Sequence, residues 1–218
     1  IALSNDGQRM LIFRDDSKGN GDIYESVLTG TEWSEAVKLP EPVNSESHES
    51  SASYSPDGRT IYFVSNRKGA IGERDIWFCT MNKNGKWGAA QNIGAPINTK
   101  ETEEGVFIHP DGKTLYFTSK GHRGEGGYDI FFSKNENGKW SAPVNMGVPV
   151  NTKDDDIFFV MEASGKTAYY TSSRTGGSGE ADIYIITFTP KENKKDKGPK
   201  LTLLKGIVYD ESNNNPLE

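Results

Sequence analysis

An Asp-Ile-aromatic tripeptide recurs four times along this chain at a nearly constant spacing. The four copies begin at Asp22, Asp75, Asp129 and Asp182, in steps of 53, 54 and 53 residues. A second series has its glycines at Gly7, Gly58, Gly112 and Gly165, each after an aspartate except the last, which follows a serine. Because independent markers share one period and one order, the sequence predicts one structural unit repeated four times.

The second copy shows how each unit is expected to fold. A short strand at 51–55 leads into the Asp-Gly turn at 56–59, and 60–65 alternates in the manner of a strand. A Gly-bearing loop precedes a third strand at 75–81, and 87–93 is the fourth. No segment keeps a period of 3.6 residues, so no helix is expected.

Four antiparallel strands per unit of this length are typical of a β-propeller blade. The predicted fold class is therefore all-β, with four blades at about 1–43, 44–97, 98–150 and 151–189. The 24 Gly and 10 Pro agree with many turns. An immunoglobulin-like sandwich has no such repeat, and a β-solenoid has a shorter one.

The first copy begins inside its innermost strand, and the last copy ends after its third strand. We therefore expect one or two further blades, or at least an outer strand, before Ile1, in a full ring of five or six blades. The segment 190–200 is polar and charged, as linkers are. The segment 201–218 again has strand character and is expected to open another β-domain.

Composition argues against several classes of function. The net charge is −6, and nucleic-acid binders usually carry a basic face, so no nucleic acid is expected as a partner. No apolar run is long enough to cross a bilayer, so direct membrane insertion is not expected. The single cysteine, Cys79, cannot form a disulfide within the chain.

The segments 54–63 and 108–117, each built around Pro-Asp-Gly, resemble the Pro-Asp, WD-like propeller repeat of the TolB type. The Asp-Ile-aromatic tripeptides strengthen this resemblance, which covers residues 1 to about 189. The first copy lacks the proline and the fourth lacks both proline and aspartate, so looser turns are expected there.

The tail, with Gly206-Ile207-Val208-Tyr209-Asp210 and Pro216-Leu217-Glu218, looks like the start of a carboxypeptidase-regulatory-like domain. A propeller followed by such a domain is similar to the layout of PorE-like OmpA-family envelope proteins of Bacteroidetes, found in type IX secretion and gliding machinery. The resemblance implies a periplasmic, outer-membrane-associated scaffold. Its implied partners are other envelope proteins or a peptide segment at the propeller face, with peptidoglycan bound only through a domain beyond this chain.

One acidic residue lies five positions after the asparagine of each Val/Ile-Asn pair. The three residues are Glu49, Glu103 and Asp156. One interpretation is an acidic ring at the channel mouth, with Glu46, Glu101, Glu104, Asp154 and Asp155 around it, that binds a cation or a basic partner segment. The other is structural: each acid accepts backbone hydrogen bonds or pairs with Arg67 or Arg174. Repetition in every blade favours the structural role. No Asp-x-Asp-x-Asp loop is present, so no metal is predicted.

Other candidate residues also have structural interpretations. The aspartate of each Asp-Ile-aromatic tripeptide is expected to accept hydrogen bonds from the preceding loop. His48, His109 and His122 are scattered, and Cys79 lies in an apolar strand, so neither zinc nor a thiol nucleophile is expected. No nucleophile elbow occurs, and no blade carries a unique cluster of acid, Tyr and Arg in its sequence.

The sequence therefore predicts a protein that is not an enzyme, has no cofactor and docks other proteins. The alternative is the propeller of a carbohydrate-active or peptide-processing hydrolase whose catalytic part lies outside this chain.

Overall fold

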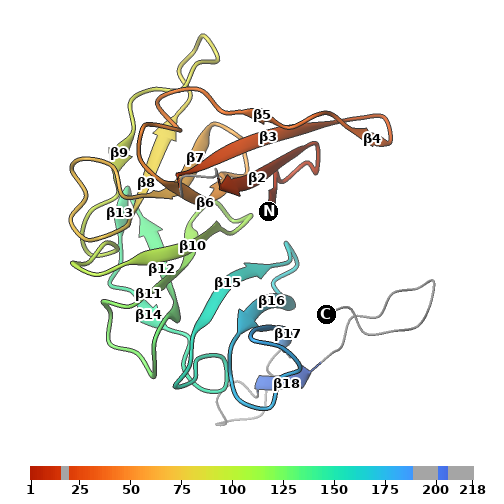
Figure 1. The fold of residues 1–218 in the computed structure, drawn as a ribbon, viewed down its shortest axis with the longest axis vertical. Helices are drawn as coiled ribbons and strands as arrows, with labels where there is room; N and C mark the ends of the chain where they lie inside the picture. The colour runs from red at the N-terminus through yellow and green to blue at the C-terminus, as the bar shows by residue number, and fades with distance from the viewer. Residues whose placement is uncertain (16–19, 189–200, 206–218) are drawn as a thin grey trace.

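The computed structural model describes residues 1–15 and 20–188, and the backbone of 201–205. These residues form four antiparallel sheets and no helix. Figure 1 shows the sheets following one another along an arc, from the red N-terminal sheet to the blue C-terminal one. The predicted all-β propeller of antiparallel blades is confirmed for these four blades.

Each sheet takes its strands from one stretch of sequence. The first blade contains β1 (Ala2–Leu3), β2 (Arg9–Asp15), β3 (Gly21–Thr29), β4 (Glu32–Trp33) and β5 (Val37–Lys38). The second contains β6 (Glu49–Tyr54), β7 (Thr60–Ser65), β8 (Asp75–Thr80) and β9 (Gln91–Asn92). The third contains β10 (Glu103–Ile108), β11 (Thr114–Ser119), β12 (Asp129–Glu136), β13 (Lys139–Trp140) and β14 (Val144–Asn145). The fourth contains β15 (Asp156–Met161), β16 (Thr167–Ser172), β17 (Asp182–Phe188) and β18 (Leu201–Lys205).

The turn between the first two strands has the same geometry in all four blades. The glycines at this turn have φ between 65° and 69°, a backbone conformation that other residues adopt at a cost. The N–H of Gly58 donates to Ser55 O at 2.8 Å, and that of Gly165 donates to Glu162 O at 2.8 Å. The expectation of a looser fourth turn is therefore wrong. The glycine makes the same bond as in the other blades, and Ser164 Oγ accepts the N–H of Lys166 at 3.2 Å, as Asp57 Oδ1 accepts that of Arg59 at 3.0 Å in blade 2.

The outer strand is less regular than the sequence predicts. In blades 1 and 3 it divides into a short hairpin strand, β4 or β13, and a second piece, β5 or β14, that pairs with the same third strand. A serine hydroxyl occupies the break: Ser34 Oγ accepts the N–H of Val27 at 3.0 Å, and Ser141 Oγ accepts that of Lys134 at 3.1 Å. The side chain replaces a ladder acceptor there.

The fourth blade also has an outer strand, which the sequence analysis did not expect. β18 pairs antiparallel with β17, from Tyr184 opposite Lys205 to Phe188 opposite Leu201. The expectation that this blade lacks a fourth strand is wrong, because a segment assigned to a following domain fills the open edge of β17. The predicted linker at 190–200 and the rest of the predicted domain, 206–218, lie outside the described residues.

Apolar side chains fill the space between successive blades. Strand alternation sends Ile61 and Phe63 toward blade 1, and Tyr62 and Val64 toward blade 3. The three cores that result are Leu11, Ile23, Leu39, Val43, Tyr54, Ile61, Phe63, Trp77 and Cys79; then Val64, Ile76, Ile97, Val106, Ile108, Leu115, Phe117 and Phe131; then Tyr116, Ile130, Val150, Phe159, Ala168, Tyr170, Tyr184 and Ile186. Each buried valine, leucine, isoleucine or phenylalanine among them contributes roughly 1.5–3 kcal/mol by leaving water.

A buried asparagine ties each of blades 1, 2 and 3 to the connection that leaves it. Asn44 Oδ1 accepts the N–H of Ile23 at 2.8 Å, and Asn44 Nδ2 donates to Ile23 O at 2.8 Å. Asn98 makes the same pair of bonds with Ile76, and Asn151 with Ile130, all at 2.9 Å. The side-chain amide of the asparagine therefore pairs with the strand as a neighbouring backbone would. This pairing explains why Val/Ile-Asn recurs in the sequence.

Candidate functional site

The three acids of the predicted ring open the innermost strands of blades 2, 3 and 4. Glu49, Glu103 and Asp156 are the first residues of β6, β10 and β15, and each is 0% exposed. Their carboxylates are directed into loops of the protein.

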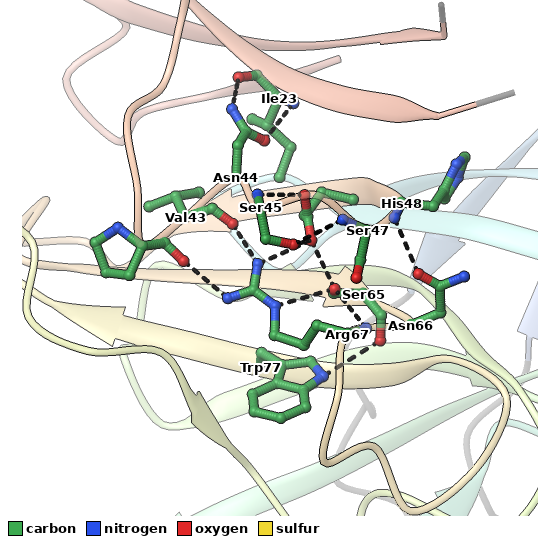
Figure 2. A network of polar contacts seen from close by, with 12 residues as sticks. Ile23, Val43, Asn44, Ser45, Ser47, His48, Ser65, Asn66, Arg67 and Trp77 are labelled. Atoms are coloured by element: carbon green, nitrogen blue, oxygen red, sulfur yellow. Dashed lines mark hydrogen bonds and ion pairs between the residues drawn. The ribbon is translucent and has the colours of Figure 1, made fainter. Parts of the chain in front are cut away.

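Glu49 forms an ion pair inside its own blade. Its Oε1 lies 2.9 Å from Arg67 Nη2 and accepts the Ser65 hydroxyl at 2.7 Å, while its Oε2 accepts the Ser45 N–H at 2.8 Å. Figure 2 shows the Arg67 guanidinium reaching the Val43 carbonyl on one side and Ser65 on the other. This network joins the connection that enters the blade to the loop that follows its second strand.

Asp156 repeats this arrangement in blade 4. Arg174 Nη2 lies 2.8 Å from Asp156 Oδ1 and donates to Val150 O at 2.6 Å. The N–H and hydroxyl of Thr152 donate to Asp156 Oδ2, at 2.6 and 2.9 Å. The pairing with Arg67 and Arg174 that the structural interpretation expected is therefore present in blades 2 and 4.

Blade 3 differs, because no arginine reaches Glu103. Its carboxylate accepts hydrogen bonds from the Thr99 N–H, the Thr99 hydroxyl and the Ser119 hydroxyl, at 3.0, 2.7 and 2.8 Å. His122 stands where the arginine stands elsewhere, with Nε2 2.8 Å from Ile97 O. Burial raises the pKa of Glu103, and these hydrogen bonds offset only part of that effect.

Three of the four aspartates of the Asp-Ile-aromatic tripeptides, Asp75, Asp129 and Asp182, contact the loops before them, as expected. Asp75 accepts the N–H groups of Ile71 and Gly72 at 2.6 and 3.1 Å, and Asp129 and Asp182 hold their own loops in the same way. Asp22 bonds Lys38 Nζ at 2.6 Å, and residues 16–19 of its loop lie outside the described part. Asp75, Asp129 and Asp182 therefore fix the conformation of their loops.

The histidines and the cysteine do not gather. Among the described residues, no group of three or more His, Cys, Asp or Glu side chains is placed to hold a metal ion. Burial raises the pKa of the Cys79 thiol to about 11, which keeps it protonated and unreactive at neutral pH.

Another cluster breaks the repeat, and the sequence analysis missed it. Glu104, one residue past the buried Glu103, lies 2.6 Å from Arg74 Nη1 and accepts the hydroxyls of Ser50 and Ser51 at 3.0 and 3.3 Å. Tyr128 adjoins this pair; burial raises its pKa, and the Glu104 charge acts in the same direction. An acid, a tyrosine and an arginine therefore do meet, although they come from two blades.

One signal in the sequence could have found this cluster. Arg74 and Tyr128 hold the same repeat position, just before an Asp-Ile-aromatic tripeptide, where blades 1 and 4 have Gly21 and Ala181. Large polar side chains at this position in two adjacent blades indicate a local departure from a structural repeat. Because the contact is between blades, it becomes visible only once the blades are stacked.

The cluster forms one wall of a cleft of about 840 Å³ that also separates blades 1 and 4. Around Arg74, Glu104 and Tyr128 the wall is completed by Ser50, Ser51 and Phe107; we call these six residues the inner wall. The rest of the lining is mainly apolar and includes Ile1, Ile12, Phe158, Val160, Tyr169 and Ile183. Within the described residues, no strand of blade 1 packs against a strand of blade 4.

One lining residue has an unusual backbone. In blades 2, 3 and 4 the pairing of the innermost strand is irregular, between Glu49 and Ala52, Glu104 and Phe107, and Ile157 and Val160 respectively. In blade 3 the irregular part contains Gly105 at φ 58°; in blade 4 the equivalent residue is Phe158 at φ 57°. A bulky residue in this region is strained, and Phe158 is 50% exposed to the cleft.

Described residues include no helix that could span a membrane. No protein-family profile matches the chain, and no curated protein matches it either.

Solved structures do match the fold. TolB from Acinetobacter baumannii superposes with a TM-score of 0.57 at 17% identity, over 96% of this chain and 44% of that one. A putative TolB from Agrobacterium tumefaciens gives 0.57 at 17% identity, over 92% of this chain and 62% of that one. A structure of a nidogen/laminin complex gives 0.50 at 12% identity, over 84% and 58%.

This chain therefore spans about half of each of these matched chains. At such identities the likeness concerns the fold alone. The four sheets share their fold with β-propellers of the TolB type.

Proposed function

We propose that this chain is a non-catalytic β-propeller that docks other proteins in the periplasm, as part of an outer-membrane-associated assembly. The envelope setting, including type IX secretion or a peptidoglycan-anchored OmpA-family protein, rests on the sequence resemblance. The likeness of fold to TolB supports the propeller architecture.

The inner wall is the observation that carries the docking role. It places polar side chains beside apolar ones in a cleft whose volume is within the usual range for binding sites. The Arg74 side chain is 40% exposed although it is paired, so its remaining N–H groups can meet backbone carbonyls of a bound segment. Phe107 supplies an apolar contact next to it. An extended peptide segment with apolar side chains fits this chemistry.

The repeated acids Glu49, Glu103 and Asp156 have no direct part in this proposal. A partner could reach their oxygens only after the loops that cover them had moved. Their role here is to hold the loops beside the cleft.

Selection from a displayed library of random peptides tests the proposal. We expect enriched peptides rich in apolar residues, whose affinity for the purified chain falls at least tenfold with Tyr128→Ala or Arg74→Ala. Val144→Ala, on exposed β14, is the matched control and should leave affinity unchanged. Peptides that bind all variants equally would contradict the proposal.

The same peptides test the alternative function, that of a peptide-processing hydrolase. Mass spectrometry of bound peptides after prolonged incubation should recover them intact. Cleavage that depends on Glu104 or Tyr128 would instead favour a peptide-processing propeller.

A further inference from the structure

Blades 2, 3 and 4 are each tied to the blade before them by the residue that precedes their buried acid. These residues are, in order, His48, Thr102 and Asp155. Each meets the residue just before the Asp-Ile-aromatic tripeptide of the preceding blade, which is Gly21, Arg74 or Tyr128. We call these three pairs the loop contacts.

His48 and Asp155 have equivalent places in their loop contacts. The N–H of Gly21 donates to His48 Nδ1 at 3.0 Å, and the N–H of Tyr128 donates to Asp155 Oδ1 at 2.8 Å; both contacts span 27 residues. The backbone N–H of each also donates to a side chain in the loop after the second strand of its own blade, at 2.9 and 3.1 Å, and Figure 2 shows this bond for His48. The two side chains therefore have one task, which is to hold the loop of the preceding blade.

The loop contact between blades 2 and 3 is made differently. Arg74 and Thr102 form a parallel backbone bridge there, and the Thr102 hydroxyl donates to Glu73 Oε2 at 3.0 Å. A threonine hydroxyl does not change its charge with pH. The three loop contacts therefore contain an imidazole, a hydroxyl and a carboxylate at one repeat position.

The imidazole and the carboxylate respond differently to acid. A neutral imidazole accepts at one ring nitrogen and donates at the other, so His48 accepts at Nδ1 only while that nitrogen carries no proton. Histidine is the side chain that ordinarily gains a proton between about pH 5 and 8, and both of its nitrogens are then donors. A proton on Nδ1 would point at the Gly21 N–H. An aspartate stays an acceptor down to about pH 4.

The packing around His48 leaves this bond little freedom to adjust. The Phe13 ring lies against the imidazole, with ring centroids 5.5 Å apart. Gly21 lies so close to both rings that a Cβ at this position would collide with them. The backbone N–H therefore faces the ring directly, and a second donor at Nδ1 has to push the loop and the ring apart.

Ionisable groups on the elements around His48 are paired with other residues or exposed. Three ion pairs lie there, namely Glu49 with Arg67, Asp22 with Lys38, and Glu104 with Arg74. In β2, Arg14 lies over the Tyr24 ring, and Asp15 and Glu46 are exposed. Carboxylates, ammonium and guanidinium groups ordinarily keep their charge between about pH 5 and 8, so His48 is the group of this set whose charge changes in that range.

We propose that His48 is a pH-sensitive switch, which closes the loop contact between blades 1 and 2 at neutral pH and opens it in mild acid, while the other two loop contacts stay closed. The stability that this bond contributes is present where the imidazole is neutral and is lost as the pH falls and the ring gains its proton. His48 also lines the cleft, so opening of this contact alters the cleft wall beside blade 1.

Amide hydrogen exchange of the 218-residue chain, followed by NMR at about pH 7.5 and about pH 5 and corrected for intrinsic rates, tests the proposal. We expect the protection factor of the Gly21 amide to fall about tenfold in acid, as for the loss of one hydrogen bond. The Tyr128 amide should keep its protection. His109→Asn removes a histidine from blade 3 and should give the wild-type result at Gly21.

Exchange of the two acceptors gives the decisive measurement. His48→Asp places a carboxylate beside Gly21, so the Gly21 amide should stay protected at both pH values. Asp155→His should transfer the acid sensitivity to the Tyr128 amide. Circular dichroism and melting curves at neutral pH check that each variant is folded, and His48→Asn, with a neutral oxygen acceptor, replaces His48→Asp if that variant unfolds.

Several results would overturn the proposal. One is a wild-type Gly21 amide that is equally protected at both pH values, and another is an acid-induced loss that persists in folded His48→Asp. A third is a folded Asp155→His variant whose Tyr128 amide is insensitive to acid. Equal losses at Gly21 and Tyr128 in the wild type would also overturn it, because they would mean that acid loosens the whole row.

Discussion

At the level of single residues, the buried carboxylates that open the innermost strands differ in what balances their charge. Glu49 and Asp156 each face a guanidinium, whereas Glu103 faces hydroxyls and one N–H. The repeat therefore keeps the position of the acid but changes the groups that face its charge. Removing the charge should lower the free energy of unfolding at the sites paired with arginine, and should leave it unchanged or raise it at Glu103.

Glu49→Gln should lower the free energy of unfolding by about 3 kcal/mol at neutral pH, because it leaves Arg67 buried without its counter-charge. Glu103→Gln should be neutral or stabilising there, because it removes a charge that burial disfavours. Urea unfolding of both variants against the wild type measures the difference. Equal losses would show that the two acids are equivalent.

The pH dependence of Glu103 follows from its raised pKa. As the pH falls, the native state takes up a proton at Glu103 before the unfolded chain does, so the wild type gains stability relative to Glu103→Gln. This contribution is fully present below the unfolded pKa of about 4.3 and is lost as the pH rises through the native value. Unfolding midpoints of both proteins at several pH values should diverge on acidification; parallel curves would contradict the assignment.

Single residues also show how far sequence reasoning reaches. The pairing of Arg67 and Arg174 with acids could be predicted, because each partner recurs at a fixed place in the period. The contact between Arg74 and Glu104 could not, because it joins two blades and occurs once.

At the level of strands, the pairing irregularity of the innermost strands is tolerated differently in different blades. Gly105 adopts its positive φ freely, while Phe158 adopts nearly the same angle at a cost of roughly 1–3 kcal/mol. Nothing in the sequence marks this site, since Phe158 stands in a run that reads as an ordinary strand.

Phe158→Gly should therefore raise the free energy of unfolding by about 1 kcal/mol, as backbone strain is relieved and little buried contact is lost. Phe158→Ala is the control: it removes the ring but keeps a Cβ at positive φ, so it should give no gain. Guanidinium unfolding compares the three proteins. A glycine variant no more stable than the alanine variant would mean that strain is unimportant here.

The outer strand of blade 4 makes a second prediction at this scale. A chain ending at residue 189 loses all five residue pairings between β17 and β18 and leaves β17 as an open edge. Backbone amides of β17 should exchange with solvent faster in this shortened chain than in the full one, with those of β7 unchanged as an internal reference. Unaltered exchange in β17 would contradict the pairing.

At the level of the whole molecule, stability should vary along the row, because blades 2 and 3 are covered on both faces and blades 1 and 4 on one. Repeats of this kind derive stability from nearest-neighbour interfaces. The four-blade row itself could be predicted from the period, while the cleft required the stacked sheets.

Native-state hydrogen exchange should therefore show the highest protection in β7, β8, β11 and β12 and lower protection in β1, β2 and β16. Uniform protection across all four blades would instead indicate a single cooperative unit.

The buried asparagine that pairs with the isoleucine of its own blade has one more consequence. Since Asn44, Asn98 and Asn151 each anchor the outgoing connection within the unit just completed, the residue after each asparagine is a natural joint. A repeat unit bounded at these positions could be duplicated, deleted or moved to another place in the row, and its internal hydrogen bonds would stay intact. Gene duplication can lengthen such a protein one unit at a time, and a protein engineer could use the same joints.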